Sequence, residues 1–562
     1  MPGPFTTAPP VRQLRRLREI ATVLVKYGFP DIVARLHLEP TFALGRRLRA
    51  LGRAPREVPR ATRVERLRLA LETLGPTFIK FGQALSIRAD LFPADVIAEL
   101  SRLQDDVPPL PFDVIRTSIE TELGRPIEAV FARFDPVALA AASIAQVHRA
   151  TLAGGEEVAV KVRRPGISAT IEGDLAIMAQ LARLVERYMP DAELYGPSRL
   201  VAEFARTVRR EQDLAREGRT IERFARNFAD DPAVHFPRVY WEQTRPGVLT
   251  LEYLDGVKLS EILRSGEGFD RPLIARRGAE VILKQILRFG LFHADPHPAN
   301  VLVLPGTVIG LLDFGSVGRL DRAVRETFAS FVLAVLRGDA ERMADAVLSV
   351  ERPPGELNVS ELKQDLAEML ESYSGMRLGE LVVGELLRES LEVMSRHRLR
   401  FPADLLLLAR AFMIVEAVGR QLDPNFQLVE QARPMVEEIL QQRYAPSAVV
   451  ERVGELGREV AGALQSLPRD LVEIVAKMRG DRLQIQFVHR NLEHFIHEMD
   501  RSSNRLSFAV VIAALIVGSS LIFQSAAGPK MFGFPALGLI GFVTAALLGF
   551  WLAIGILRSG RL

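Results

Sequence analysis

The stretch FHADPHPANVLVLPGTVIGLLDFG, which runs from Phe292 to Gly315, decides the fold. Its second half, two short apolar runs separated by Pro305-Gly306, predicts a β-hairpin. Asn300 stands where the hairpin begins and Asp313 where it ends, so we expect the two side chains to converge. A carboxylate and a carboxamide are hard oxygen donors, which Mg²⁺ prefers where it also holds nucleotide phosphates. The stretch therefore predicts a metal site formed by Asn300 and Asp313.

Asp295 lies five residues before Asn300, which is the spacing of the catalytic aspartate and the metal-binding asparagine in kinase catalytic loops. Three features occur together here: this spacing, the apolar hairpin, and the Asp-Phe-Gly tripeptide that begins at Asp313. Their combination indicates a kinase site far more specifically than any one of them does. The plainer alternative is a buried hairpin with polar ends. We interpret the stretch as a kinase-type nucleotide site, with Asp295 as the catalytic aspartate and ATP and Mg²⁺ as cofactors.

A lysine that orients nucleotide phosphates is expected upstream. Lys161 follows Val-Ala-Val in the segment EEVAVKVRRPG, whose alternation predicts a strand, and SIAQVHRATL with the Gly154-Gly155 turn completes a hairpin. In kinases such a lysine pairs with a helix glutamate. The helical segment 200–228 offers several acidic residues, and we predict that Glu217 is the partner. Lys161 and Glu217 are therefore candidate catalytic residues.

Two more stretches are expected to contact the nucleotide. The segment VLTLEYLDG (Val248–Gly256) predicts a buried strand and a linker, with Glu252 and Leu254 at the adenine. Where a kinase has its glycine-rich loop, four small residues occur: Ala140, Ala141, Ala142 and Ser143. Each Cβ hinders positive φ angles and keeps backbone amides farther from phosphate. We expect this loop to be stiffer than a glycine loop and to hold the nucleotide differently.

Whole-chain composition narrows the class of protein. The 562 residues are enough for two or more domains, and a formal net charge of only +3 does not indicate a nucleic-acid binder. The absence of cysteine excludes disulfides, thiolate metal sites and a cysteine nucleophile. No secretory signal is recognised at the N-terminus.

Two uncharged runs, Leu506–Phe523 and Phe534–Leu557, are each near the length needed to cross a bilayer. They predict a transmembrane helical hairpin, with a buried core hairpin as the alternative. Arginines flank the pair whereas its loop holds only Lys530, so both ends and the large soluble part are expected on the cytoplasmic side of the inner membrane. The basic segments 11–28 and 42–72 are either solvated helix faces or contacts with an anionic membrane.

Together these residues resemble the UbiB family of atypical kinase-like proteins, the aarF-domain group linked to ubiquinone biosynthesis. Besides the alanine loop, two features carry the resemblance. The segment Lys80–Pro109 begins with Lys-Phe-Gly-Gln, and Glu-Gln-Asp at 211–213 is followed by Glu217. Ala145 and Ala299 stand where the family usually has glycine, which are changes of a single carbon.

The resemblance implies an α+β, bilobal protein-kinase-like fold with an N-terminal helical extension and a C-terminal transmembrane helical hairpin. The expected parts are a basic helical segment, the helical extension, the N-lobe, the C-lobe with a helical tail, and the two transmembrane helices: residues 1–60, 61–125, 126–255, 256–500 and 506–557. It also implies that Lys80 and Gln83 lie over the site, with Lys80 meeting Glu211 or Asp213. These four residues would close the site against bulky substrates.

A conventional protein kinase is not expected. Position 294 is alanine, so the arginine that receives an activation-loop phosphate is absent, and an apolar-periodic helix follows Gly315 almost at once.

The expected function is that of a membrane-anchored atypical kinase or ATPase supporting isoprenoid quinone biosynthesis, with an unknown phosphoacceptor. Its expected partners are membrane lipids and quinone-pathway enzymes or lipid precursors, without nucleic acid, and a homodimer stays open. The alternatives are a small-molecule kinase of the aminoglycoside or choline type and a non-catalytic, nucleotide-gated scaffold.

Overall fold

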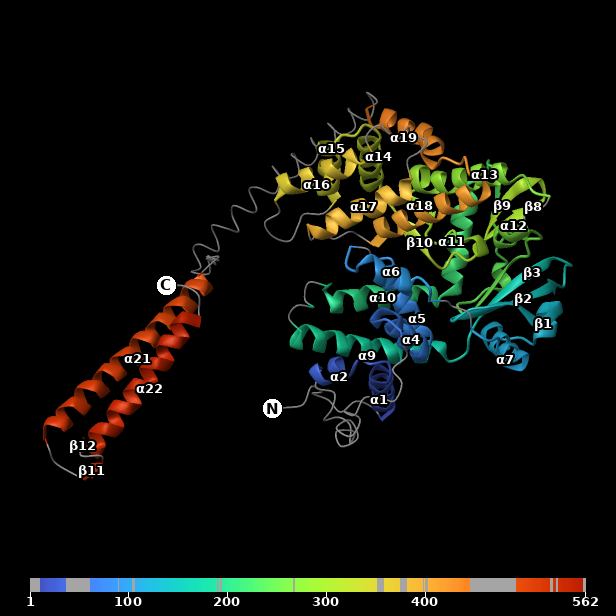
Figure 1. Ribbon diagram of the computed structural model, residues 1–562. Helices are drawn as coiled ribbons and strands as arrows, with labels where there is room; N and C mark the ends of the chain where they lie inside the picture. The colour runs from blue at the N-terminus through green and yellow to red at the C-terminus, as the bar shows by residue number, and fades with distance from the viewer. Residues whose placement is uncertain are drawn as a thin grey trace, which may run out of the picture. The chain divides into compact units, whose positions relative to one another are not determined.

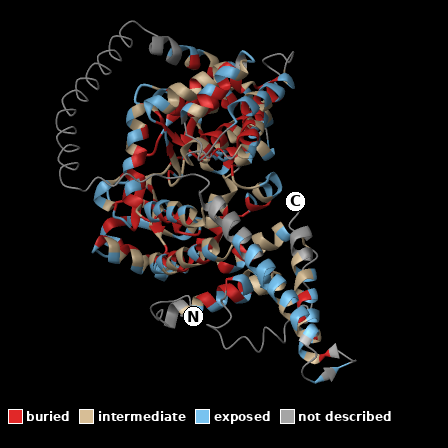
Figure 2. Cartoon of the chain, turned by 90° about the vertical axis from the view of Figure 1, so that its left-hand side faces the viewer, coloured by how far each residue is buried: buried red, intermediate tan, exposed pale blue. Residues whose placement is uncertain are grey.

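The computed structural model describes most of the chain (Figure 1). The described residues are 11–36, 61–88, 90–103, 107–189, 192, 195–265, 268–350, 358–373, 382–397, 399, 403–444, 492–525, 529–531 and 534–558. They belong to two compact units, Met1–Arg452 and Val453–Leu562. Buried residues gather in the interior of the first unit, whereas the helices of the second are mostly exposed (Figure 2). The predicted basic segment 42–60 and the predicted helical tail over 445–491 lie outside the described residues.

The N-lobe is built on a four-stranded antiparallel sheet in the order β1-β2-β3-β5. Its strands and the two helices packed on it are β1 (Phe131–Ala141), β2 (Ala145–Leu152), β3 (Glu157–Arg163), β5 (Val248–Glu252), α7 (Phe112–Leu123) and α8 (Ile127–Val130). Val158, Val160 and Val162 are fully buried on one face of β3, as the alternation predicts. They pack against Ile115 and Ile119 of α7. The lysine strand is thus fixed by its apolar face.

Within the described residues, seven helices form the helical extension. They are α1 (Val11–Lys26), α2 (Pro30–Arg35), α4 (Arg63–Leu74), α5 (Pro76–Ser86), α6 (Ala94–Leu100), α9 (Ile167–Tyr188) and α10 (Pro197–Glu211). Although α9 and α10 fall within the range predicted for the N-lobe, they share one hydrophobic core with the earlier helices. Gly82 permits this packing, because a Cβ there would overlap the side chains of Leu71 and Leu103. The glycine of the Lys-Phe-Gly-Gln motif is therefore explained by close packing.

The C-lobe combines short strands with a large helical part around one core. Its strands and short helices are β4 (Val234–His235), β6 (Val257–Lys258), η3 (Lys284–Phe289), β7 (Leu291–His293), η4 (Pro298–Asn300), β8 (Val301–Leu304), η5 (Pro305–Thr307), β9 (Val308–Leu311) and β10 (Val317–Arg319). Its helices are α12 (Leu259–Ser265), α13 (Arg271–Leu283), α14 (Arg322–Leu336), α15 (Ala340–Val350), α16 (Val359–Glu371), α17 (Val383–Arg396), α18 (Ala403–Leu422) and α19 (Leu428–Tyr444). The short helix η2 (Trp241–Gln243) contacts β5 of the N-lobe sheet. Between the lobes lies α11 (Leu214–Asn227).

The hairpin predicted over residues 301–311 is confirmed. Strands β8 and β9 pair antiparallel from Val301 opposite Leu311 to Leu304 opposite Val308. They form the middle of a sheet in the order β4-β9-β8-β6. Only residues 314–321 separate Asp313 from α14, and part of this segment is β10, which pairs with β7. The chain after the hairpin is therefore short and structured, as predicted.

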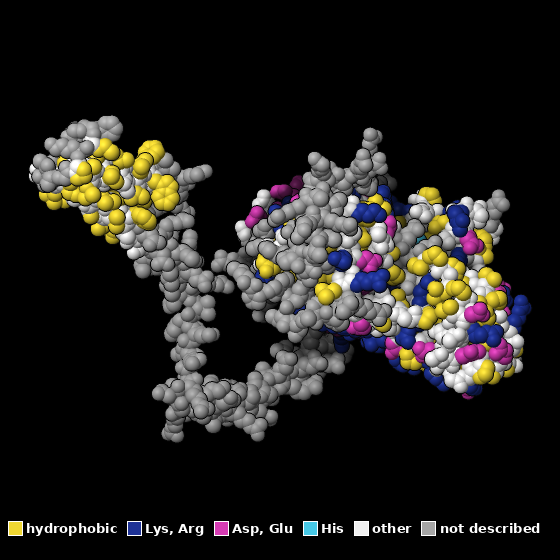
Figure 3. Space-filling model, turned by 90° about the horizontal axis from the view of Figure 1, so that it is seen from below, with side chains coloured by type: hydrophobic (Ala, Val, Ile, Leu, Met, Phe, Trp, Pro, Cys, Tyr) yellow, Lys and Arg dark blue, Asp and Glu magenta, His cyan; other side chains and the backbone are white. Residues whose placement is uncertain are grey.

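The second unit contains a helical hairpin of α21 (Leu492–Ser525) and α22 (Ala536–Arg558), joined through the short strands β11 (Lys530–Met531) and β12 (Phe534–Pro535). Apolar side chains cover much of its surface that is visible in Figure 3. Leu537, Phe550 and Trp551 are among the exposed large apolar residues of this hairpin. The helices coincide with the two predicted transmembrane runs. However, no helix of the described residues is both long and apolar enough to cross a membrane, so the structure does not support the transmembrane prediction.

Candidate active site

Lys161 meets two carboxylates that lie far from it in the sequence. Its Nζ donates to Glu217 Oε1 and Oε2 at 2.8 and 2.9 Å, and to Asp313 Oδ1 at 2.8 Å. Because Val160 and Val162 point into the N-lobe core, strand alternation directs Lys161 to the opposite face of β3. The structure thus brings together the predicted pair of Lys161 and Glu217, and it places Asp313 directly on the same ammonium group.

Glu217 connects the lysine strand to the Asp-Phe-Gly segment. Its side chain is only 6% exposed, and Oε1 also accepts a hydrogen bond from the backbone N–H of Phe314 at 3.1 Å. Asp213 begins the helix that carries it, since its side chain accepts a hydrogen bond from Arg216 N at 3.2 Å. Burial raises the pKa of Glu217, and the Lys161 ammonium opposes this rise. Glu217 is therefore a buried anchor for both Lys161 and the backbone beside Asp313.

The electrostatics of this cluster favour an ionised Asp313. Burial disfavours the charged form of Lys161, but Asp313 and Glu217 outweigh this effect and raise its pKa above the ordinary lysine value. The Lys161 ammonium, with a smaller contribution from Lys80, holds the pKa of Asp313 well below its usual range. Asp313 has a left-handed backbone with φ 55°, which aspartate tolerates better than most residues, and its side chain is 56% exposed. At neutral pH it presents a full negative charge to solvent.

The loop around Asp295 is held by the buried ring of His293. The Asp295 N–H donates to His293 Nδ1 at 3.1 Å, so this nitrogen carries no proton. The other ring nitrogen, Nε2, must then be the donor to the carbonyl of Leu312 at 3.0 Å. The His293 N–H donates to Gln285 Oε1 at 2.9 Å. One neutral imidazole therefore joins the Asp295 loop to the residue before Asp313.

Asn300 and Asp313 lie at the same open end of the hairpin, because Leu312 N–H donates to the Asn300 carbonyl at 2.8 Å. The Asn300 amide nitrogen donates to the Asp295 carbonyl at 3.3 Å, which leaves its side-chain oxygen available. Asp313 Oδ2 has no hydrogen-bond partner among the described residues. These hard oxygens fit a Mg²⁺ ion that phosphates also hold. No group of three or more His, Asp or Glu in the described part of the chain forms a metal site by itself.

The alanine loop is an ordered turn. The predicted loop residues end β1 and lead into β2: Ala140, Ala141, Ala142 and Ser143. Ala142 N–H donates to Ala145 O at 2.8 Å, and Arg164 Nε donates to Ala142 O at 2.8 Å. The same guanidinium reaches Pro108 O at 2.8 Å. Ser143 is fully buried, and its hydroxyl has no hydrogen-bond partner in the described structure. Arg164 thus ties the loop to the segment that continues the Lys-Phe-Gly-Gln motif.

The predicted hinge residues differ in their surroundings. The Glu252 carboxylate contacts His235 Nε2 at 3.0 Å and accepts from Arg238 N–H at 3.0 Å, so it links β5 to the β4 segment. Tyr253 N–H donates to the carbonyl oxygen of Glu157 in β3. The backbone N–H and C=O of Leu254 have no hydrogen-bond partner among the described residues. Leu254 therefore offers free backbone groups to an adenine edge, whereas the Glu252 side chain is engaged within the protein.

The Lys-Phe-Gly-Gln motif reaches the site through Lys80. Its Nζ lies 3.0 Å from Glu211 Oε2 at the end of α10, whereas Asp213, the other predicted partner, caps α11. Gln83 Nε2 donates to the Leu103 carbonyl at 3.0 Å. Lys80 also lies close enough to Asp313 to contribute to its lowered pKa. The extension therefore adds a second cation beside the cluster of Lys161, Glu217 and Asp313.

Sequence reasoning missed three residues that hold the site. His293 stands two residues before Asp295, a spacing that could have suggested its role. Arg164 follows the lysine strand but resembles a surface charge in the sequence. Arg410 of α18 donates from Nη2 to Asp295 Oδ1 at 3.2 Å, across 115 positions of sequence. No local pattern marks Arg410.

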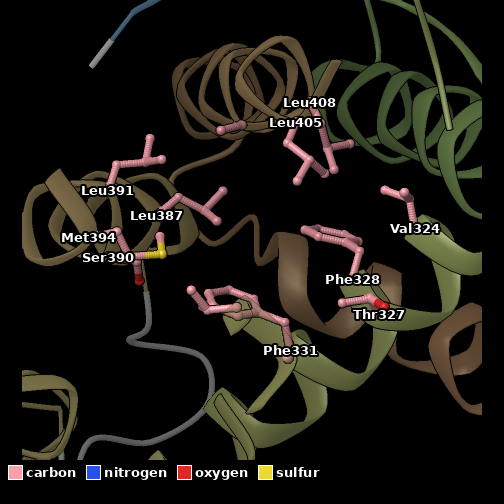
Figure 4. Close-up of a pocket in the computed structure, with 13 residues that line it drawn as sticks. Val324, Thr327, Phe328, Phe331, Leu387, Ser390, Leu391, Met394, Leu405 and Leu408 are labelled. Carbon is pink, nitrogen blue, oxygen red and sulfur yellow. The ribbon is translucent and has the colours of Figure 1, made fainter. Parts of the chain in front are cut away.

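A separate apolar cavity lies in the C-lobe between α14, α15, α17 and α18 (Figure 4). Phe328 of α14 and Leu405 and Leu408 of α18 form parts of its wall. The hydroxyl of Ser390, also on the wall, donates to Leu386 O at 2.7 Å. The cavity shares no residue with the charged cluster and offers no charge to a phosphate group. The cavity is therefore separate from the charged cluster around Lys161.

A small sheet lobe carries Lys161, a helix between the lobes carries its partner Glu217, and a helical lobe carries the Asp295 loop and the Asp-Phe-Gly segment. This arrangement defines a kinase-like protein. Three family profiles match the chain in order. They are the ABC1 atypical kinase-like domain over residues 102–347, the UbiB helical domain over 366–427 and the ABC1/UbiB kinase-like C-terminal domain over 490–558.

Relatives match over nearly the whole chain. A "Probable protein kinase UbiB" of Xanthomonas euvesicatoria pv. vesicatoria is 35% identical over 528 residues, which cover 92% of this chain and 93% of the relative. A protein with the same name from Pseudomonas fluorescens is 36% identical, with 82% and 87% covered. An "Uncharacterized protein in hydrogenase 1 5'region" of Clostridium pasteurianum is 31% identical, with 97% and 99% covered. The chain belongs to the UbiB family of atypical kinase-like proteins.

Among solved structures, the complex of Rv3197 with erythromycin from Mycobacterium tuberculosis is similar. It aligns with a TM-score of 0.47 and 24% identity, over 65% of this chain and 93% of that chain.

Proposed function

We propose that this protein is an atypical kinase or ATPase that binds Mg-ATP between its two lobes and supports isoprenoid quinone biosynthesis. The observation that carries the proposal is the position of Lys161, which contacts Glu217 and Asp313 at once. This arrangement holds an ammonium and an ionised carboxylate side by side at the open end of the β8–β9 hairpin. A nucleotide phosphate needs the first, and its magnesium ion needs the second.

Each residue of the site has a distinct task in this proposal. Lys161, oriented by Glu217, binds phosphate oxygens. Asn300 and Asp313 would hold Mg²⁺, which supplies positive charge to the phosphates as they transfer. Asp295 orients the attacking hydroxyl or water and accepts its proton at a carboxylate oxygen. The free backbone groups of Leu254 pair with the adenine edge.

The proposed site is closed against bulky substrates. The ion pair between Lys80 and Glu211 joins α5 to α10 within the helical extension, beside Asp313. Arg164 further ties the alanine loop to Pro108 of the same extension. These contacts favour water or a small molecule as the phosphoacceptor over a protein side chain. A small-molecule kinase of the aminoglycoside or choline type and a nucleotide-gated scaffold remain the competing functions.

The proposal also includes an association with lipid at the cytoplasmic face of the inner membrane. Its support is the apolar surface of the α21–α22 hairpin, where the side chains of Leu506, Leu537, Phe550 and Trp551 are about two-thirds exposed or more. Exposed apolar surface of this extent marks an interaction site. The quinone pathway is supported by family membership. Lipid precursors and enzymes of that pathway are the proposed partners, and a homodimer is compatible with the proposal.

Phosphate release from ATP by the full-length chain tests the function. We expect Mg²⁺-dependent release that rises with anionic liposomes and with alkylphenols that resemble quinone precursors, and that disappears in Asp313→Asn. Phosphorylation of a soluble amino alcohol would favour the small-molecule kinase. Mg-ATP binding without any turnover would favour the scaffold. Absence of Mg-ATP binding would refute all three readings.

A further inference from the structure

The carboxylate of Asp295 is held by a residue from outside the kinase-like core. Arg410 Nη2 donates to Asp295 Oδ1 at 3.2 Å, and the two side chains are 33% and 35% exposed. Arg410 lies in the middle of α18, within residues 366–427 that match the UbiB helical domain. We infer that Arg410 is a positioning residue for phosphoryl transfer, through which the helical domain sets the orientation of the Asp295 carboxylate.

The backbone of Asp295 is already fixed without Arg410. Its N–H donates to His293 Nδ1, and its carbonyl accepts from His297 N–H and from the Asn300 side chain. These contacts place the Cα atom but leave the side-chain torsions free. Among the described residues, the carboxylate itself has only Arg410 as a hydrogen-bond partner. The direction of the carboxylate thus depends on this one contact.

Helix α18 is well placed to make that contact reproducible. In its first turn, Asp404 Oδ1 accepts from Arg319 N–H at 3.1 Å, and Arg319 belongs to β10, which pairs with the β7 strand leading into Asp295. Farther along, the buried carboxylate of Glu416 accepts from the N–H groups of Val383 and Gly384 at the start of α17. Arg410 lies between these two anchors, so its guanidinium is presented from a fixed support.

The geometry leaves one carboxylate oxygen for chemistry. Arg410 contacts Oδ1, whereas Oδ2 has no partner among the described residues. A carboxylate held at one oxygen and free at the other can orient an acceptor hydroxyl and take its proton. A misplacement of about 1 Å at such a group costs roughly 100-fold in rate. Arg410 therefore acts on turnover through Asp295 and has little effect on nucleotide binding, which other residues provide.

This inference rests on the proposed function, and steady-state ATP turnover of the full-length chain tests both. We expect Arg410→Gln to lower kcat about 10- to 100-fold while changing the KM for ATP by less than about twofold. Arg410→Lys keeps a cation on the same helix but loses the planar guanidinium, so it should recover most of the lost kcat. In an Asp295→Asn background, Arg410→Gln should cause no further loss, because the group that it orients has been removed.

Arg388→Gln is the matched control. Arg388 lies on α17 of the same domain and pairs with Glu392 across a half-exposed helix surface, so its removal should leave kcat and KM unchanged. If Arg410→Gln behaves like Arg388→Gln, or raises kcat, the inference is wrong while the proposed function stands. If it lowers kcat but adds its full effect to Asp295→Asn, Arg410 does not act through Asp295, and the inference is again wrong. If the native chain does not turn over ATP, the proposed function fails and the inference fails with it.

Discussion

Replacing Lys161 with methionine leaves Glu217 and Asp313 without the cation that both now contact. Removing one partner of a buried ion pair costs about 3–5 kcal/mol, because the other charge stays buried and unpaired. Glu217, at 6% exposure, meets this condition. Asp313 is 56% exposed, so water screens its charge and it adds at most about 1 kcal/mol. We therefore expect Lys161→Met to destabilise the N-lobe by about 3–5 kcal/mol at pH 8.

The loss should depend on pH in a definite direction. Burial already raises the pKa of Glu217, and without the opposing Lys161 it would rise further. When the pKa of a carboxyl group is higher in the folded protein than the value of about 4.3 in the unfolded chain, the protein becomes more stable as the pH falls through the folded-state pKa. Lys161→Met should therefore be less destabilised at pH 5 than at pH 8. Adding Glu217→Gln removes the buried charge and should recover most of the stability at pH 8, yet ATP turnover should stay absent.

Urea unfolding monitored by Trp241 fluorescence measures these changes. Trp241 donates to Glu222 of α11, so it reports on the helix that carries Glu217. The other tryptophan, Trp551, lies in α22 and is replaced by phenylalanine in every variant of the series. Additive losses in the single and double variants, or an equal loss at pH 5 and pH 8, would refute the reasoning that Lys161 and Glu217 form a buried pair.

Four further predictions concern the site and the hairpin. Asp313→Asn should abolish Mg²⁺-dependent nucleotide binding in calorimetry because it removes the full negative charge at the metal, and unchanged Mg-ATP affinity would exclude Asp313 from the site. Ala140→Gly should change the preference for ATP over ADP or the turnover rate by restoring backbone freedom, which competition binding and phosphate release measure. Lys80→Ala should permit autophosphorylation with radiolabelled ATP while lowering native turnover, and the closed-site proposal fails if neither changes. Truncation after residue 491 should abolish co-sedimentation with liposomes but keep Mg-ATP binding, and full retention on membranes in high salt would exclude the α21–α22 hairpin as the main contact.

Local patterns predicted the parts of the site that lie within single elements. The apolar runs around Pro305-Gly306 specify β8 and β9, because turn chemistry and strand alternation act over a few residues. The same argument places Lys161 on the face of β3 opposite its valines. Helical periodicity alone does not separate Glu217 from the other acidic residues of its segment, so its selection was a choice among several candidates. Periodicity likewise could not decide whether Lys80 pairs with Glu211 or with Asp213.

Contacts across long sequence separations could not be predicted in this way. Helices α9 and α10 join the core of the extension through buried side chains such as Ile171 and Phe204, although they follow the lysine strand in the sequence. In the sequence, Arg164 resembles a surface arginine. In the structure its guanidinium donates to the carbonyl oxygens of Ala142 and Pro108. The two uncharged C-terminal runs are helical, as their composition indicates.

The sequence by itself predicted the lysine strand and the β8–β9 hairpin and proposed Lys161, Asp295, Asn300 and Asp313 as site residues, because backbone propensity and side-chain periodicity are local properties. Only the tertiary structure decided which charges share a partner. In the folded chain, Asp313 contacts the same ammonium group as Glu217. Lys80 pairs with Glu211, and Arg410 donates a hydrogen bond to Asp295. Such pairings depend on core packing and on which charged groups are desolvated. Both are determined only when segments that are distant in the sequence come into contact.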